Sequence, residues 1–179
     1  GETLTIPPYN VTINMAGHTI SGGKLEVEMG GPKLNLIGGG TINCLAELNG
    51  HIHGDAKFLQ KVTLVPNDEC NIYGGSFYGE VTTNDPNGGG AVRIHGGTFY
   101  DTVSTAGCNN ATVSDGVFHE DASFLCGGGP GYVLGGVFYK DVTVRGSACE
   151  VFAGIFFKEN PTATPSEGTV SMDVIFDAN

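Results

Sequence analysis

The sequence predicts an all-β protein, a β-solenoid of about eight coils with roughly 18 to 22 residues in each coil. The first observation is a seven-residue pattern that returns at residues 72–78, 94–100, 113–119, 133–139 and 151–157. The second is its spacing, because the phenylalanine near the end of each copy recurs after 22, 19, 20 and 18 residues. A period of about 20 residues without helical periodicity is typical of one solenoid coil.

Glycine content is the third observation. The 179 residues include 30 glycines, while hydrophobic residues make up 40 % of the chain. Glycines at fixed places in each copy fit corners that need a positive φ, and the hydrophobic content is too high for a disordered chain. The length predicts one domain, residues 1–179, with N-terminal coils at 1–36, regular coils at 37–160 and a closing segment at 161–179. We expect this domain to be a segment of a longer protein.

The N-terminal coils carry weaker versions of the same signals. Short strands are expected at residues 4–6, 11–15, 24–29 and 34–36. Copies that match fewer positions of the repeat lie at residues 15–21 and 37–43. The 35 residues between Ile42 and Phe77 leave room for one degenerate copy around residues 53–61.

From Cys70 onward each copy is predicted to contain a strand, a glycine corner, a phenylalanine strand, an acidic turn and a further strand. Loops of variable length at residues 84–90 and 127–131 separate some copies, as stacked coils allow. A last strand is expected within residues 170–176. We interpret the acidic residues of the turns as solvated: Asp101, Glu120, Asp121, Asp141 and Glu159.

Residues 11–22 read Val-Thr-Ile-Asn-Met-Ala-Gly-His-Thr-Ile-Ser-Gly. This segment resembles the opening coils of the pectin-lyase-like superfamily, in which an aliphatic strand precedes a Gly-His or Gly-Lys corner and Thr-Ile-Ser-Gly. The resemblance implies a single-stranded right-handed parallel β-helix, a fold frequent in secreted and surface proteins of bacteria and in phage fibres. It implies no catalytic residue. Residues 48–54 are similar to bactofilins, which polymerise end to end, although the Gly-Gly-x-Phe unit departs from that family.

Charge restricts the classes of partner. The chain has 8 basic and 19 acidic residues, a net charge of -11. Binding to nucleic acids or anionic lipid surfaces depends on lysine and arginine, so we expect neither partner. No run of 18 apolar residues is present, so we expect no membrane insertion. A glycan, a protein surface or a second copy of this chain fits this charge, and we expect no cofactor.

The five cysteines, Cys44, Cys70, Cys108, Cys126 and Cys149, lie at one end of the repeat. Stacked coils bring equivalent residues to about 5 Å, close to the Cα separation of a disulfide. Cys70, Cys108, Cys126 and Cys149 are therefore expected to form bridges between coils or a ladder of buried free thiols. We favour free thiols, because cysteine packs as a small apolar residue. No Cys-x-x-Cys occurs, and one His-x-His at His51 and His53 is a weak signal, so we expect no metal site.

The phenylalanine of the repeat does not vary, which fits an inward column, whereas the residues beside it do. If phenylalanine points inward, the residue after it and the residue before the glycine pair point outward. The sequence therefore predicts an exposed aromatic stripe made of Tyr73, Tyr78, His95, Tyr100, His119, Tyr139 and Phe157. Exposed apolar patches usually mark a contact surface, and sugar rings stack on aromatic faces. Rings that only stiffen the solenoid surface are an equally consistent interpretation.

The sequence favours a non-enzymatic β-helix of a secreted, cell-surface or virion-fibre protein, acting in adhesion, in binding or as a rigid spacer. One alternative is a lyase or hydrolase that acts on polysaccharides. Another is a filament or trimeric fibre that assembles from copies of the chain. A glycan hydrolase needs two carboxylates at one bond, whereas the acidic residues here occupy successive turns. Neither of the two arginines, Arg93 and Arg145, has the acidic neighbours expected of a lyase. We therefore predict no catalytic residue.

Overall fold

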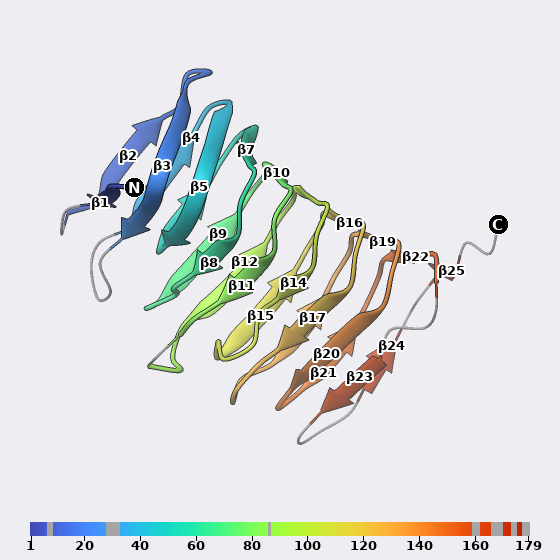
Figure 1. Cartoon of the computed structure of the whole chain (residues 1–179). Coiled ribbons are helices and arrows are strands. Elements are labelled where there is room, and N and C mark those ends of the chain that lie inside the picture. The colour runs from blue at the N-terminus through green and yellow to red at the C-terminus, as the bar shows by residue number, and fades with distance from the viewer. Residues whose placement is uncertain are drawn as a thin grey trace.

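The computed structural model describes residues 1–6, 9–27, 33–85, 87–158, 162–165, 170–172 and 175–176. These residues form a parallel β-solenoid of about seven turns, without a helix (Figure 1). The predicted all-β solenoid is thus confirmed, with about seven turns in place of about eight. In the same described residues, no helix has the length and apolarity to cross a membrane.

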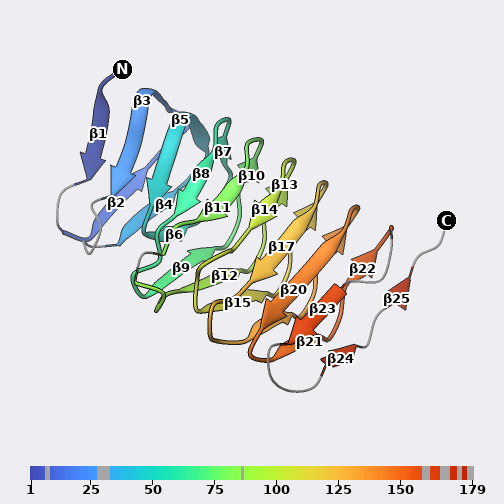
Figure 2. The same cartoon turned by 60° about the horizontal axis from the view of Figure 1, so that its bottom comes forward.

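Three rows of parallel strands run along the solenoid (Figure 2). The first row is a nine-stranded sheet of β2 (Val11–Asn14), β4 (Leu34–Ile37), β6 (Gly50–Ile52), β9 (Glu69–Ile72), β12 (Ala91–Ile94), β15 (Asn110–Val113), β18 (Gly131–Val133), β21 (Cys149–Val151) and β24 (Val170–Met172). The second row is β7 (Ala56–Phe58), β10 (Ser76–Phe77), β13 (Thr98–Phe99), β16 (Val117–Phe118), β19 (Val137–Phe138), β22 (Ile155–Phe156) and β25 (Ile175–Phe176).

The third row is β8 (Val62–Leu64), β11 (Val81–Thr83), β14 (Val103–Ser104), β17 (Ala122–Leu125), β20 (Val142–Gly146) and β23 (Thr162–Pro165). The second and third rows meet at β5 (Gly40–Leu48), which pairs with both β7 and β8. Beyond β5 the sheet continues to β3 (Thr19–Val27) and β1 (Thr3–Ile6). Strands β23, β24 and β25 lie in the predicted closing segment, and each extends one of the three rows.

Equivalent residues of successive coils stack in register. Ile72, Ile94, Val113, Val133 and Val151 form one buried column in the first row, as the repeat predicts. The repeat phenylalanines form a second buried column, with ring centroids 4.7–4.9 Å apart in each neighbouring pair. The degenerate copy around residues 53–61 is confirmed as a coil, because Phe58 pairs with Phe77 and extends this column.

The glycine corner changes the direction in which side chains point. Its second glycine has a positive φ, for example +113° at Gly97, a conformation that residues with a side chain rarely adopt. The inward–outward alternation of the strand is therefore interrupted at each corner. Ile72 and Phe77 are both buried, whereas Tyr73 and Tyr78 are 46 % and 45 % exposed. The predicted orientation of these four positions is confirmed.

We expect Phe118→Ala to lower the free energy of unfolding by about 3–5 kcal/mol, because it opens a cavity inside the phenylalanine column. Chemical denaturation monitored by circular dichroism measures this loss. The control is Tyr139→Ala, which removes an exposed ring on the next coil and should cost much less. Equal losses in the two variants would contradict the inward role of Phe118.

Candidate binding surface

The outward residues that follow the second row form one continuous column, here called the Tyr78 column. Its members are Leu59, Tyr78, Tyr100, His119, Tyr139 and Phe157. From Tyr78 to Phe157, neighbouring ring centroids lie 4.6–5.0 Å apart and neighbouring ring planes differ by at most 11°. Five of the seven residues predicted for the aromatic stripe lie in this column.

The stacking decides which part of each ring a ligand can reach. Tyr100, for example, has Tyr78 against one face and His119 against the other. The edges of the rings, with the tyrosine hydroxyls and imidazole nitrogens, are left for solvent. Within this column a sugar therefore meets ring edges and polar atoms, and the face-on stacking expected from sequence is blocked at the interior rings.

The outward residues that follow the first row form a second column, here called the Tyr73 column. Its members are His53, Tyr73, His95, Ser114, Leu134 and Phe152. Ring centroids lie 4.4 Å apart from His53 to Tyr73 and 4.7 Å apart from Tyr73 to His95, with planes within 8°. The stacking stops after His95, because the next coil supplies Ser114.

Sequence reasoning placed Tyr73 and His95 in a single stripe with the other five residues. The structure shows two columns, separated by the glycine corner. It also adds His53, Leu59, Leu134 and Phe152, which the predicted stripe omitted. Aligning the degenerate coil on Phe58 would have found His53 and Leu59, since they occupy the positions of Tyr73 and Tyr78.

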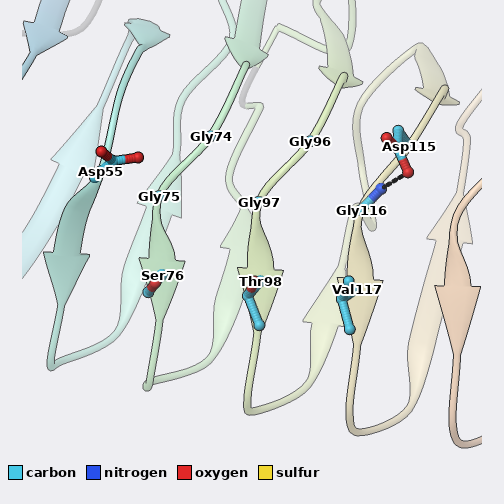
Figure 3. Close-up of a pocket in the computed structure, with 10 residues that line it drawn as sticks. All are labelled: Asp55, Gly74, Gly75, Ser76, Gly96, Gly97, Thr98, Asp115, Gly116 and Val117. Atoms are coloured by element: carbon cyan, nitrogen blue, oxygen red, sulfur yellow. Dashed lines mark hydrogen bonds between the residues drawn. The ribbon is translucent and has the colours of Figure 1, made fainter.

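A shallow notch of about 340 Å³ follows the glycine corner (Figure 3). The glycine backbone of residues 74–75 and 96–97 lines its middle, and Asp55 and Asp115 lie at its two ends. Ser76 and Thr98 lie along one side, at the start of the second-row strands. We call the notch and the two flanking columns the corner face.

A buried amide holds part of the corner face in place. Asn71 is only 3 % exposed, and its Nδ2 donates a hydrogen bond to Nδ1 of His51 over 3.0 Å. Nε2 of His95 in turn donates to Oδ1 of Asn71 over 3.1 Å. This chain of hydrogen bonds fixes the imidazole of His95 in the plane in which it stacks on Tyr73. It also requires Nδ1 of His51 to be unprotonated, because that atom accepts a hydrogen bond.

The pKa of His51 is lowered from its usual value, first because burial disfavours the charged imidazole and then because Lys33 and His53 lie nearby. Glu69 acts in the opposite direction and only partly offsets these effects. The folded protein therefore binds fewer protons at this site than the unfolded chain does. The stability from neutral His51 is present above the ordinary histidine pKa of about 6.5 and is lost as the pH falls below it.

We expect the melting temperature to decrease when the pH is lowered from 7.5 to 5.5, and His51→Gln to reduce that decrease. Glutamine keeps an acceptor for Asn71 but does not titrate. Thermal melts of the two proteins at both pH values test this, with His18→Gln as the control on an exposed histidine. A decrease that is as large in His51→Gln as in the unaltered protein would show that His51 is not the group responsible.

The carboxylates of the corner face do not form a hydrolase pair. Asp55 and Asp115 occupy equivalent corner positions three coils apart, which places them about 14 Å apart at ~4.8 Å per coil. The two carboxyl groups of a glycosidase lie about 5–9.5 Å apart. Asp115 is also turned toward its own corner, where its Oδ1 accepts a hydrogen bond from the Gly116 N–H over 2.8 Å (Figure 3).

The turn carboxylates make local contacts, as their solvated position suggested. Asp101 accepts a hydrogen bond from the Thr102 N–H, and Asp141 pairs with Lys158 over 2.6 Å. Asp121 accepts from the backbone N–H of Asp141, Glu120 is exposed, and Glu159 lies outside the described residues. Arg93 pairs with Glu69 over 2.7 Å. No group of three or more potential metal ligands occurs in the part of the chain that the structure describes.

The cysteines do not form one ladder. Cys70 and Cys149 share a column of the first row, but Val92, Ala111 and Gly131 separate them. Cys108 and Cys126 lie directly opposite each other in neighbouring coils, and Cys44 lies in β5. All five are thiols in the structure, with no disulfide among them. The inserted loops move Cys108 and Cys126 out of the column of the other two, which the repeat alone did not reveal.

The thiols differ in burial and acidity. Burial raises the pKa of Cys70 to about 11. A hydrogen bond between the two thiols lowers the pKa of Cys108 and raises that of Cys126. Cys126 is half-buried and lines a second notch of about 290 Å³ with Arg145, whereas Cys108 is fully buried.

We expect iodoacetamide at pH 8 to alkylate Cys126 in the folded protein well before Cys70, because Cys126 reaches solvent whereas Cys70 is buried and closed to the reagent. Peptide mass spectrometry at timed intervals measures the two rates. Labelling in concentrated urea is the control and should modify all five cysteines. Equal rates for Cys70 and Cys126 under native conditions would contradict this assignment.

Comparisons of the chain with models of protein families, with curated proteins and with solved structures found no match. The parallel solenoid is established by the structure itself. The resemblance of residues 11–22 to pectin-lyase-like proteins and the similarity of residues 48–54 to bactofilins stay predictions. The function of the corner face must therefore be argued from its own geometry.

Proposed function

We propose that the chain is a rigid, non-enzymatic binding module of a secreted, cell-surface or virion-fibre protein, and that the corner face binds an uncharged glycan. The observation that carries this proposal is the notch between two columns of exposed rings. A surface that combines ring edges, hydroxyl groups and exposed backbone suits a ligand with both C–H and O–H groups. The pectin-lyase-like resemblance of the opening coils is consistent with such a module.

Charge favours a neutral glycan over an acidic one. The net charge is -11, and Asp55 and Asp115 lie at the ends of the notch. An acidic polysaccharide would have to approach these carboxylates, with Lys57 of β7 as the cation at the register position of the lining residue Ser76. A neutral sugar can instead donate hydroxyl hydrogen bonds to the carboxylates and accept them from the tyrosine hydroxyls.

The rigidity of the corner face supports a binding module over an enzyme. Each ring of the Tyr78 column is held by its neighbours, and each coil is held in register by three rows of strands. Little side-chain entropy is left to lose when a ligand binds. The separation of Asp55 from Asp115 does not match a hydrolase, which makes the polysaccharide-active enzyme the weaker alternative.

We expect the protein to bind at least one neutral glycan on an array, and the triple substitution of Tyr78, Tyr100 and Tyr139 to serine to weaken that binding at least tenfold. The same three positions changed to phenylalanine keep the rings and remove only the hydroxyls, so this variant should lose less affinity than the triple-serine variant, and its loss measures the hydroxyl contribution. Circular dichroism must show that the sheet is retained in both variants.

Two results would contradict the proposal. One is an array without any neutral glycan bound, and the other is an affinity that the folded triple-serine variant leaves unaltered. Sedimentation velocity of the same proteins tests the remaining alternative. An oligomer that dissociates in the triple-serine variant would make the corner face a contact between copies of this chain.

A further inference from the structure

At Ser114 the Tyr73 column has a small side chain between the larger ones of His95 and Leu134, and we call this position the slot. His95, Ser114 and Leu134 occupy the same position in three successive coils, as the backbone hydrogen bonds Ser114 N–H to Ile94 O and Leu134 N–H to Val113 O show. At ~4.8 Å per coil, the backbone positions of His95 and Leu134 lie about 10 Å apart along the axis. One ring stacked at the ordinary distance of about 4.5–5 Å fits between them.

The wall formed by His95 is held before any ligand arrives. One face of its imidazole stacks on Tyr73 at 4.7 Å, with the two planes 8° apart. Its Nε2 is hydrogen-bonded to the buried Asn71, which is itself bonded to His51. The other face points along the axis toward the level of Ser114, and among the residues that the structure describes no second ring stacks on it. This is the ring face that the continuous Tyr78 column does not offer.

The other sides of the slot combine apolar and polar groups. Leu134 is 42 % exposed and forms the opposite, apolar wall. Half-buried Ser114 contributes a hydroxyl at the floor. The next residue, Asp115, lines the end of the notch, so the slot opens toward the glycine corner. A carboxylate and a hydroxyl beside a ring face match a ligand that has C–H groups on its face and hydroxyl groups at its rim.

We infer that the slot between His95 and Leu134 binds one neutral pyranose ring, which stacks on His95 and donates hydroxyl hydrogen bonds to Ser114 and Asp115. This inference rests on the proposed function and names one subsite within it. The neighbouring sugar of a longer glycan would then lie in the notch over Gly96 and Gly97. Asp115 and the net charge of the chain disfavour a uronic acid in the slot.

NMR of the labelled protein tests the slot with small probes. Methyl β-glucopyranoside and methyl β-galactopyranoside are the neutral probes, glucuronic acid is the charged probe and p-cresol is the aromatic probe. We expect a neutral pyranoside at millimolar concentration to shift the ring C–H signals of His95, with no such shift from glucuronic acid. A shift produced by p-cresol but by neither pyranoside overturns the inference in favour of an aromatic side chain from a protein partner.

Filling the slot gives the decisive comparison. Ser114→Phe supplies a ring between His95 and Leu134, and should abolish the pyranoside shift while keeping or raising the melting temperature. Ser123→Phe is the matched control, because Ser123 is a half-buried outward serine in the same coil but on the third row. If Ser114→Phe does not fold, Leu134→Ser, which removes the exposed apolar wall, should weaken pyranoside binding at least fivefold.

The outcomes separate this inference from the proposed function. Glycan binding on the array that survives Ser114→Phe overturns the slot and leaves the proposed function standing. An equal loss of pyranoside binding in Ser114→Phe and Ser123→Phe also overturns the slot, because a ring on the third row would then weaken binding as much as a ring in the slot does. If neither neutral pyranoside shifts the ring C–H signals of His95, the slot is overturned. If no neutral glycan binds on the array, the slot and the proposed function are both overturned.

Discussion

The positive φ of the second corner glycine is the constraint on which the arrangement of both surfaces depends. In a continuous strand, Ile72 and Phe77 would point to opposite sides because they are five positions apart, an odd number. The corner at Gly75, with φ +105°, lets both enter the core. The same corner turns Tyr73 and Tyr78 outward and leaves the glycine backbone exposed between them. Core, ring columns and notch therefore follow from one repeated backbone feature.

Much of the fold follows from the repeat, since each coil places equivalent residues at equivalent positions. The buried column of Ile72 and its equivalents, the inward phenylalanines and a degenerate coil around residues 53–61 were all predicted in this way. The repeat gives no angle between strand rows, so the prediction joined the two outward columns of Tyr73 and Tyr78 into a single stripe. It also gives no ring orientation, so the mutual covering of the tyrosine faces was not predicted.

Contacts outside the repeat were the least predictable. Asn71 is a polar residue at an outward strand position, and nothing in the sequence indicates that its amide joins His51 to His95. The pairing of Cys108 with Cys126 depends on loops whose conformation the repeat does not determine. Both features arise because a side chain contacts the next coil, and the residue it meets there depends on the register. The candidate site was therefore predicted as a set of exposed rings but not as a shaped surface.

The direction of the inter-coil hydrogen bonds has a mechanical consequence. In a parallel solenoid these bonds run along the rod axis, so the coil junctions are in series and each one carries the full tension applied to the two ends. The weakest junction then determines the force at which the rod separates. Stacked rings strengthen the junctions they bridge, and the coil of Ser114 lacks one such contact with the coil of His95. A glycan held at that level would add a contact across this junction and so share the load on it.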